Sequence, residues 1–248
     1  PQGYSERFVK KKIFSLLFNL SDQVIVNSLD FKKQVKKILN VNSICIYNPL
    51  EDSNFINKKA KKKIKFKFFR SNCLNIISIG RLVKQKNHIT ILKAANILKN
   101  KLNFKLLIMG DGEEKNNLFK FIENNKLKKN VKIIGFKKNP YPYINKSNIF
   151  VLSSLYEGLP NVLLEALSMK KFVISSDCYA GPKEILKKGK YGELFKVKDY
   201  KQLSKKIEFY YFNKKKLQKK TLLGFKSLER FDYENKCKLY LKVIKKYL

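Results

Sequence analysis

Two glutamates stand eight positions apart in the stretch SSLYEGLPNVLLEAL, which occupies residues 153–167. Glu157 comes near its start and Glu165 near its end. Gly158 and Pro160 lie between them and predict a tight turn, because proline is favoured at the beginning of a helix. The stretch therefore predicts the end of a strand, a turn and the start of a helix, with one carboxylate on each side of the turn.

The helix predicted at 161–169 would begin with unpaired backbone donors. The N–H groups of Asn161 and Val162 fall in its first turn, where they lack partners within the helix and could bind phosphate oxygens. Glu165 lies one turn further on the same face, and a carboxylate accepts hydrogen bonds well from two vicinal hydroxyls. Its neighbours are apolar, which favours a functional over a merely exposed Glu165. We expect a ligand with both phosphate and hydroxyl groups, with Glu157 further out.

A second candidate site is GRLVKQKN, residues 80–87, which follows an apolar run. Gly80 ends the predicted strand, Arg81 comes next, and Lys86 precedes a helix that Asn87 could cap. Two cations and a helix N-terminus would suit a diphosphate. The alternative is an ordinary pair of surface cations.

The stretch MGDGEEK, residues 109–115, is a weaker signal. It contains G-x-G after a predicted strand, but Lys115 stands where a dinucleotide fingerprint would need its third glycine. Gly110 and Gly112 are therefore interpreted first as turn residues, and a dehydrogenase is disfavoured.

The stretch SSDCYAGPKEIL, residues 175–186, predicts a strand end, a turn and a short helix. Glu184 opens that helix, where a carboxylate is stabilised by the helix dipole. The sequence gives it no further role.

Alternating strands and helices must position these residues. Apolar runs predict strands at 74–80, 104–110, 131–135, 149–153 and 172–176, with helices between them, one carrying Ile91, Leu92, Ala95 and Leu98 and the next Leu118, Ile122 and Leu127. This β-α-β-α pattern predicts an α/β fold with a doubly wound, Rossmann-like parallel sheet. In such sheets ligands bind beyond the carboxyl ends of the strands, where these runs end in Gly or Ser.

The first 55 residues have a different organisation: a basic helix at about 4–20, a strand at 23–28, a helix at 29–39 and a strand at 43–48. Because two strands do not make a stable parallel sheet alone, we expect the tail of a second α/β domain. The predicted division is 1–55 for this remnant, 56–72 for a linker, 73–228 for the ligand-binding domain and 229–248 for a closing helix that packs back toward the remnant, with Leu239, Val243 and Ile244 at core-like spacing.

The chain has 248 residues and a formal net charge of +36, which invites a nucleic-acid interpretation. Only four basic residues are arginines, however, namely Arg7, Arg70, Arg81 and Arg230, and Arg is the side chain best suited to phosphate and base recognition. We therefore favour a Lys-rich solvated surface. Two non-catalytic alternatives stay open: a nucleic-acid-binding protein and a membrane-surface scaffold. The latter would use helix 4–20 and the basic segment 57–70, whose simplest interpretation is a solvated loop.

No metal site is expected. Cys45, Cys73, Cys178 and Cys237 form no C-x-x-C pair, and the single histidine, His88, cannot complete a common zinc site with them. Free thiols are typical of the reducing cytoplasm. No apolar run reaches the ~18 residues of a membrane-spanning helix.

Together the stretches EGLPNVLLEAL, GRL…QKN, MGDG, NVKIIGF and GPKEIL resemble the donor-binding, C-terminal domain of GT-B glycosyltransferases, closest to family 4 of the retaining enzymes. The resemblance runs from about residue 20 to residue 210, and its most specific element is the E-x7-E spacing of Glu157 and Glu165.

The resemblance implies a role for each matched residue. Arg81 and Lys86 would bind the donor diphosphate and, with Glu157 at the transferred sugar, form the catalytic set. Glu165 would hold the ribose, Asn161 and Val162 would donate to phosphate, and Gly135 and Phe136 would flank the base. The predicted nucleotide site also includes Gly80, Gly110 and Gly158.

The same resemblance implies an activity. The expected reaction is transfer of a hexose or N-acetylhexosamine from a UDP-sugar to a glycan or lipid-linked acceptor for surface polysaccharides, with no metal or other cofactor and no nucleic-acid partner. The expected location is the cytoplasm, with contact to the anionic inner face of the cell membrane. Since the family's N-terminal domain is almost wholly missing from this sequence, we expect the 248 residues to bind donor nucleotide but to transfer little sugar.

Overall fold

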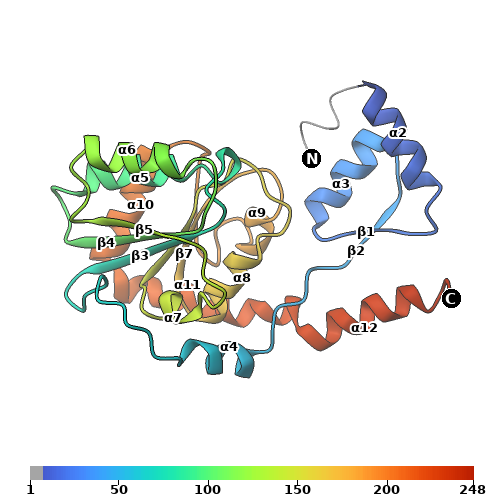
Figure 1. The fold of residues 1–248 in the computed structure, drawn as a ribbon. Helices are drawn as coiled ribbons and strands as arrows, with labels where there is room; N and C mark the ends of the chain where they lie inside the picture. The colour runs from blue at the N-terminus through green and yellow to red at the C-terminus, as the bar shows by residue number, and fades with distance from the viewer. Residues whose placement is uncertain (1–7) are drawn as a thin grey trace.

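The structure, a computed structural model, describes residues 8–248 and is dominated by one parallel sheet of six strands (Figure 1). Their order is β5-β4-β3-β6-β7-β8. The strands are β3 (Leu74–Ile79), β4 (Phe104–Met109), β5 (Val131–Ile134), β6 (Ile149–Leu152), β7 (Phe172–Ser176) and β8 (Glu193–Phe195). The chain starts in the middle at β3, builds outward to β5, and then returns to β6 and builds the other way. The predicted doubly wound α/β sheet is thereby confirmed.

Helices cover both faces of this sheet, as the apolar runs of the strands require. One core joins the sheet to α5 (His88–Leu98), α6 (Lys115–Asn124), α10 (Tyr200–Phe212) and part of α11 (Lys214–Lys226). The second joins its other face to α7 (Tyr141–Asn145), α8 (Asn161–Ser168), α9 (Pro182–Ile185) and η2 (Ser227–Phe231). Both faces of the strands are thus removed from water.

A small unit precedes the large domain. It consists of α2 (Phe8–Asn19), β1 (Val24–Val26), α3 (Leu29–Leu39) and β2 (Ser43–Cys45), with β1 and β2 paired in parallel. Its core is small and centres on Val26, Val35 and Val41. Residues 4–7 of the predicted first helix lie outside the described residues. The two sheets fall within the predicted ranges 1–55 and 73–228, whereas the domain boundaries stay a prediction.

Two features of the large domain differ from the sequence expectations. The edge strand β8 was not predicted, because three residues give too short a pattern. Asn87 was expected to cap α5, but its backbone is left-handed and its side chain makes no capping bond. Instead the Asn87 amide donates to Thr90 Oγ1 at 2.7 Å and to the carbonyl of Ser153 at 3.3 Å.

The basic segment 57–70 is not simply a solvated loop. Its beginning belongs to α4 (Ser53–Ala60), which packs beside α7 and buries Ile56. Phe66 and Phe69 pack against the second core as well. The lysines of the segment alternate with anchored apolar side chains.

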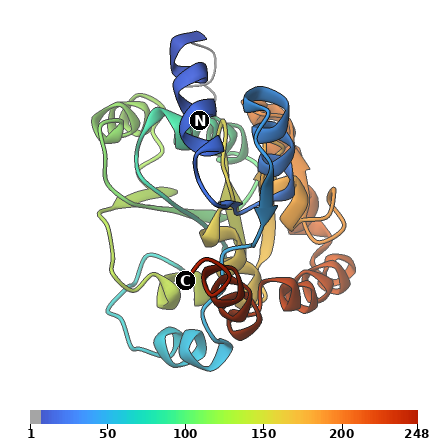
Figure 2. The same ribbon diagram turned by 90° about the vertical axis from the view of Figure 1, so that its right-hand side faces the viewer.

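The closing helix, α12 (Tyr233–Ile244), runs below the small unit in Figure 1 and, seen nearly end-on and dark red, in Figure 2. Tyr240 donates to the carbonyl of Ile46 at 3.3 Å, and Lys236 lies over the Tyr47 ring. The expected burial of Leu239, Val243 and Ile244 is wrong: Leu239 and Ile244 are exposed and Val243 is half-buried. The contact is made by the neighbouring stripe of the helix. Of the helices in the described residues, none is both long and apolar enough to cross a membrane.

Candidate functional site

Most of the predicted site residues lie in the segments that follow β3 and β6, two strands that lie side by side. The chain leaves these two strands in opposite directions, toward β4 on one side and β7 on the other. Connections that diverge in this way open a crevice beyond the carboxyl ends of the strands. The loop 80–87 follows β3 and the loop 153–160 follows β6, so both border this crevice.

Hydrogen bonds join the two loops directly. Gln85 donates its side-chain amide to the carbonyl of Tyr156 at 2.9 Å, and its own carbonyl accepts from the N–H of Leu155 at 2.8 Å. The Ser153 hydroxyl donates to the carbonyl of Lys86 at 2.8 Å. These contacts fix Lys86 relative to the Glu157 loop, although the two segments are far apart in sequence.

Lys86 and Glu157 form a buried ion pair where the two loops meet. Lys86 Nζ lies 2.6 Å from Glu157 Oε1, and only 16% and 7% of the two side chains are exposed. The hydroxyl of Ser154 donates to the same carboxylate oxygen at 2.6 Å. Lys86, predicted to bind phosphate, and Glu157, predicted to bind the sugar, are therefore in direct contact. A molecule bound by both residues would have to lie against this ion pair.

Arg81 is placed differently from Lys86. Its side chain is exposed, and within the described part of the chain its guanidinium makes no hydrogen bond or ion pair. The Lys86 stem lies beside Gly80, within 3.5–3.6 Å of where a Cβ would stand. One cation is thus held in place and the other is available to an anionic ligand.

The start of α8 supplies backbone donors on the other side of Glu157. Pro160 precedes the helix, and no side chain caps it. Among the hydrogen bonds of the described residues, none has the N–H of Asn161 or Val162 as its donor. The Asn161 side chain accepts a bond from the Asn48 amide at 3.0 Å. These N–H groups are what a phosphate would bind at a helix N-terminus.

Glu165 is the second carboxylate of the predicted site and, unlike Glu157, it has no cationic partner among the described residues. Burial, followed by the charge of Glu51, raises its pKa to about 7. Tyr141 is nearby and donates to Glu51 Oε2 at 2.8 Å. In the described residues no hydrogen bond reaches the Glu165 carboxylate. A buried acceptor without a partner can bind ligand hydroxyls, and the role of Glu165 in binding a ribose stays a prediction.

The glycines after β4 and β5 allow close backbone contact beside the crevice. A Cβ on Gly110 would lie 1.9 Å from the carbonyl oxygen of Gly80, and one on Gly135 3.2 Å from Asp111 Oδ2. The role of Gly110 in the structure is therefore to let two loops meet, and its contact with a nucleotide stays a prediction. Phe136, 76% exposed, offers an open ring at this end.

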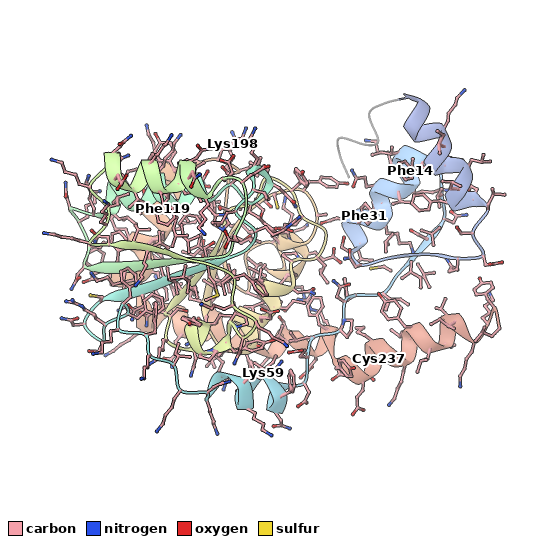
Figure 3. The ribbon with its side chains drawn as sticks, viewed as in Figure 1. Phe14, Phe31, Lys59, Phe119, Lys198 and Cys237 are labelled. Atoms are coloured by element: carbon pink, nitrogen blue, oxygen red, sulfur yellow. The ribbon has the colours of Figure 1, made fainter. Side chains whose placement is uncertain are left out.

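Gly158 lies on the turn between the two glutamates, packed by other segments. A Cβ on Gly181, which has a left-handed φ of +84°, would come within 2.2 Å of the Gly158 carbonyl. On its other side Gly158 faces Asn27 of the small unit. Here a cavity of about 230 Å³ lies between Phe31 and Glu157, and Figure 3 labels Phe31 on the part of α3 that lies toward the large domain.

Sequence reasoning missed Gln85, Ser154 and Tyr156, which hold the two loops together. The only signal was their position directly beside Lys86 and Glu157. His88 lies outside the polar crevice; burial and then the charge of Lys86 lower its pKa to about 4, so it is neutral at pH 7. In the described residues, no three His, Cys, Asp or Glu side chains gather as a metal site would require.

Two curated relatives cover most of this chain. It is 35% identical over 195 residues to an uncharacterized glycosyltransferase of Methanocaldococcus jannaschii, which covers 75% of this chain and 48% of the relative. It is 34% identical over 197 residues to the N-acetylgalactosamine-N,N'-diacetylbacillosaminyl-diphospho-undecaprenol 4-alpha-N-acetylgalactosaminyltransferase of Campylobacter jejuni, covering 76% of this chain and 50% of that enzyme. The chain thus spans about half the length of these relatives.

Solved structures confirm the fold. A glycosyltransferase from Rickettsia africae superposes with a TM-score of 0.80 at 19% identity, over 99% of this chain and 66% of that one. Anabaena Alr3699/HepE, in complex with UDP and glucose, superposes with a TM-score of 0.84 at 18% identity, over 96% of this chain and 67% of that one. The fold is that of GT-B glycosyltransferases, as predicted.

The glycosyl transferases group 1 family matches residues 59–221, which include Arg81, Lys86, Glu157 and Glu165. With two thirds of its length inside this match, the chain belongs to the glycosyl transferases group 1 family.

Proposed function

We propose that the chain carries the donor site of an enzyme that transfers a hexose or N-acetylhexosamine from a UDP-sugar. The acceptor would be a glycan or a lipid-linked saccharide used for surface polysaccharides or glycoconjugates. One observation carries the proposal: the buried Lys86–Glu157 pair joins the loop of Arg81, whose guanidinium is available, to the loop that leads into the unpaired N–H groups of α8. The names of relatives support the class, since two Campylobacter jejuni enzymes act on undecaprenol-linked saccharides.

The residues of the site have different roles in the proposed reaction. Negative charge develops on the diphosphate when its bond to the sugar breaks, and Arg81, Lys86 and the first N–H groups of α8 would offset it without a metal ion. Glu157, fixed by Lys86 and Ser154, would orient the sugar. We propose that the sugar keeps its anomeric configuration, by analogy with the retaining enzymes that the sequence resembles.

Glu165 would recognise the ribose, because its carboxylate is buried and lacks a hydrogen-bond partner among the described residues. The preference for uridine over other bases rests on the UDP complexes of structural neighbours such as HepE. Gly135 and the exposed ring of Phe136 would flank the base.

Titration calorimetry of the 248-residue chain with UDP, GDP and ADP tests this proposal. We expect UDP to bind most tightly, in the micromolar to millimolar range, and Glu165→Gln to weaken it about tenfold, or about 1.4 kcal/mol. Glu123→Gln is the matched control, since Glu123 is exposed near the C-terminal end of α6 and, among the described residues, pairs only with the exposed Lys128. A preference for GDP or ADP would contradict the proposed UDP-sugar donor. A folded chain that binds no nucleotide would contradict the proposed nucleotide site itself.

We further propose that the protein works in the cytoplasm at the anionic inner face of the membrane. The apolar side chains of Ile13, Leu16 and Leu17 on α2, and of Leu20 just after it, are exposed, and Lys12 on the same helix is exposed as well. Apolar side chains with neighbouring lysines favour an anionic lipid surface. The four cysteines are free thiols, which suits a reducing compartment. No nucleic-acid partner is proposed, and the low transfer activity expected of these 248 residues stays a prediction.

A further inference from the structure

No residue of the motif GPKEIL has a role in the proposed reaction. Its Glu184, however, accepts several hydrogen bonds across the contact between the large domain and the small unit. Glu184 stands in α9, which forms the side of the large domain nearest α3 (Figure 1). Its carboxylate accepts hydrogen bonds from the N–H of Leu29 at 3.0 Å and from the N–H of Asp30 at 3.4 Å. The hydroxyl of Tyr47 donates to the same carboxylate.

These contacts complete the N-terminal cap of α3. The Ser28 side chain accepts from the N–H of Phe31, as an ordinary N-cap does. The two preceding N–H groups, of Leu29 and Asp30, are bound by Glu184 instead, from 155 and 154 positions further along the chain. A negative charge at this end of a helix is stabilised by the helix dipole. The small unit thus obtains part of its cap from the large domain.

The other side of α9 is held firmly. Arg230 donates to the carbonyl of Glu184 at 3.3 Å and to that of Ile185 at 2.9 Å. The neighbouring Phe231 packs its ring 4.9 Å from the ring of Tyr47. Burial and then the hydrogen bond to Glu184 raise the pKa of Tyr47, so its hydroxyl stays a donor at physiological pH. Glu184 therefore joins a fixed helix to the start of α3, and Tyr47, which follows β2 and packs against the large domain, holds the same carboxylate.

We propose that Glu184 is a positioning residue that locks α3 against the large domain and thereby sets the width of the cavity that Glu157 faces. Phe31, two positions beyond Leu29, lines that cavity opposite Glu157 and Gly158. The Tyr179 hydroxyl, also at the cavity, reaches the carbonyl of Asp30 at 3.5 Å. Movement of α3 would change the space beside the reacting sugar, while the Arg81 and Glu165 contacts would stay as they are.

Amide hydrogen exchange on the 248-residue chain tests this contact without any assay of activity. In Glu184→Ala we expect the amides of Leu29 and Asp30 to exchange at least about tenfold faster, since local opening governs exchange. The Phe31 amide, bonded to Ser28, serves as internal reference. Glu113→Ala, an exposed glutamate away from the interface, is the matched control. Unchanged exchange at Leu29 and Asp30 in a folded Glu184→Ala chain would overturn the proposal.

Two milder variants keep the test decisive if Glu184→Ala does not fold. Glu184→Gln retains one oxygen acceptor and should give intermediate exchange rates. Tyr47→Phe should loosen the same contact, because it removes the hydroxyl that donates to the Glu184 carboxylate. In both, the affinity for UDP should stay within about twofold of the parent chain, because no predicted nucleotide ligand is touched. Parent-like exchange in both variants, or a large loss of UDP affinity in either, would contradict a positioning role.

The effect of Glu184 on sugar transfer rests on the proposed function and is measured in a separate experiment. In an assay of UDP-sugar hydrolysis, or of sugar transfer by a complete enzyme that contains these residues, we expect Glu184→Ala to lower kcat and leave KM for the UDP-sugar near the parent value, with partial rescue in Glu184→Gln. A rise in KM alone would contradict positioning. A parent chain with no nucleotide affinity would overturn the proposed function, while the exchange experiment would still decide whether Glu184 locks α3.

Discussion

Arg81 is the site residue whose removal should be most informative, because its guanidinium is available to a ligand whereas Lys86 is already paired with Glu157. We expect Arg81→Ala to lower turnover of a complete enzyme about a hundredfold or more, since preorganised charge at a leaving group contributes about 3–4 kcal/mol per donor. Steady-state kinetics with the preferred UDP-sugar measures the effect. Arg70→Ala, an exposed arginine of the segment before β3, is the control. Near-normal turnover in Arg81→Ala would remove Arg81 from the catalytic set.

Glu165 should make the stability of the chain depend on pH. Its pKa is about 7 in the folded protein, against 4.5 for the unperturbed group. Between these values the folded chain holds a proton that the unfolded chain releases, so the free energy of unfolding falls as pH rises from about 4.5 to about 7. We expect Glu165→Gln to remove this part of the pH dependence. Urea unfolding at pH 5 and at pH 8 measures it.

The second cause of the pKa shift at Glu165 provides a control for this experiment. Glu51→Gln removes the neighbouring negative charge, so it should move the titration of Glu165 to lower pH without abolishing it. An identical pH profile in the parent chain and in Glu165→Gln would show that Glu165 does not titrate in this window.

Among the connecting elements, the turn after β4 depends on a glycine that no other residue can replace. A Cβ at position 110 would stand 1.9 Å from the carbonyl oxygen of Gly80, with φ at +151°. We expect Gly110→Ala to destabilise the fold by about 3 kcal/mol or more, because both backbone strain and a steric clash oppose it. The midpoint of urea unfolding measures this. Gly80→Ala is the matched control, since its nearest contacts would be ordinary ones at 3.5 Å, and equal losses in both variants would contradict the argument.

The central strands and the site residues on their ends could be predicted from sequence because local patterns specify them. Buried strands such as β3 and β4 are mostly apolar, with only Asn75, Ser78 and Lys105 as polar members, and the loops after them carry the candidate site side chains. The E-x7-E spacing likewise lies within one turn and one helix. Short, half-buried elements such as β8 carry too few residues for a pattern to appear.

Contacts between distant segments could not be predicted in this way. The Lys86–Glu157 pair joins residues 71 positions apart, and the Glu184 contacts cross 155. Periodicity shows which face of α12 is apolar, but it does not show that Leu239 lies in water while Tyr240 packs on the small unit. Such contacts depend on how whole elements pack, which a single sequence does not encode locally.

For the whole molecule, the surface around α2 gives a test of membrane contact. We expect the chain to cosediment with vesicles of phosphatidylglycerol and phosphatidylcholine, less with pure phosphatidylcholine, and less again as salt rises, because lysines near an anionic surface contribute about 1 kcal/mol each. Leu16→Glu with Leu17→Glu should reduce binding, since both side chains are exposed on α2. Leu222→Glu, an exposed leucine of α11, is the control. Equal binding to neutral and anionic vesicles would contradict electrostatic attachment.

The strand order also has a consequence for how the protein is made. β3 lies at the centre of the sheet and leaves the ribosome before every other strand of the large domain, yet its partner on one side, β6, follows only after β4 and β5. During synthesis one edge of this buried, mostly apolar strand therefore waits for Ile149–Leu152, and such an open edge invites pairing with other chains. Because the crevice forms at that same edge, the nascent chain has no site until β6 docks. Slowing translation between β5 and β6 should therefore increase aggregation of the nascent chain, whereas molecules that have already folded should be unaffected.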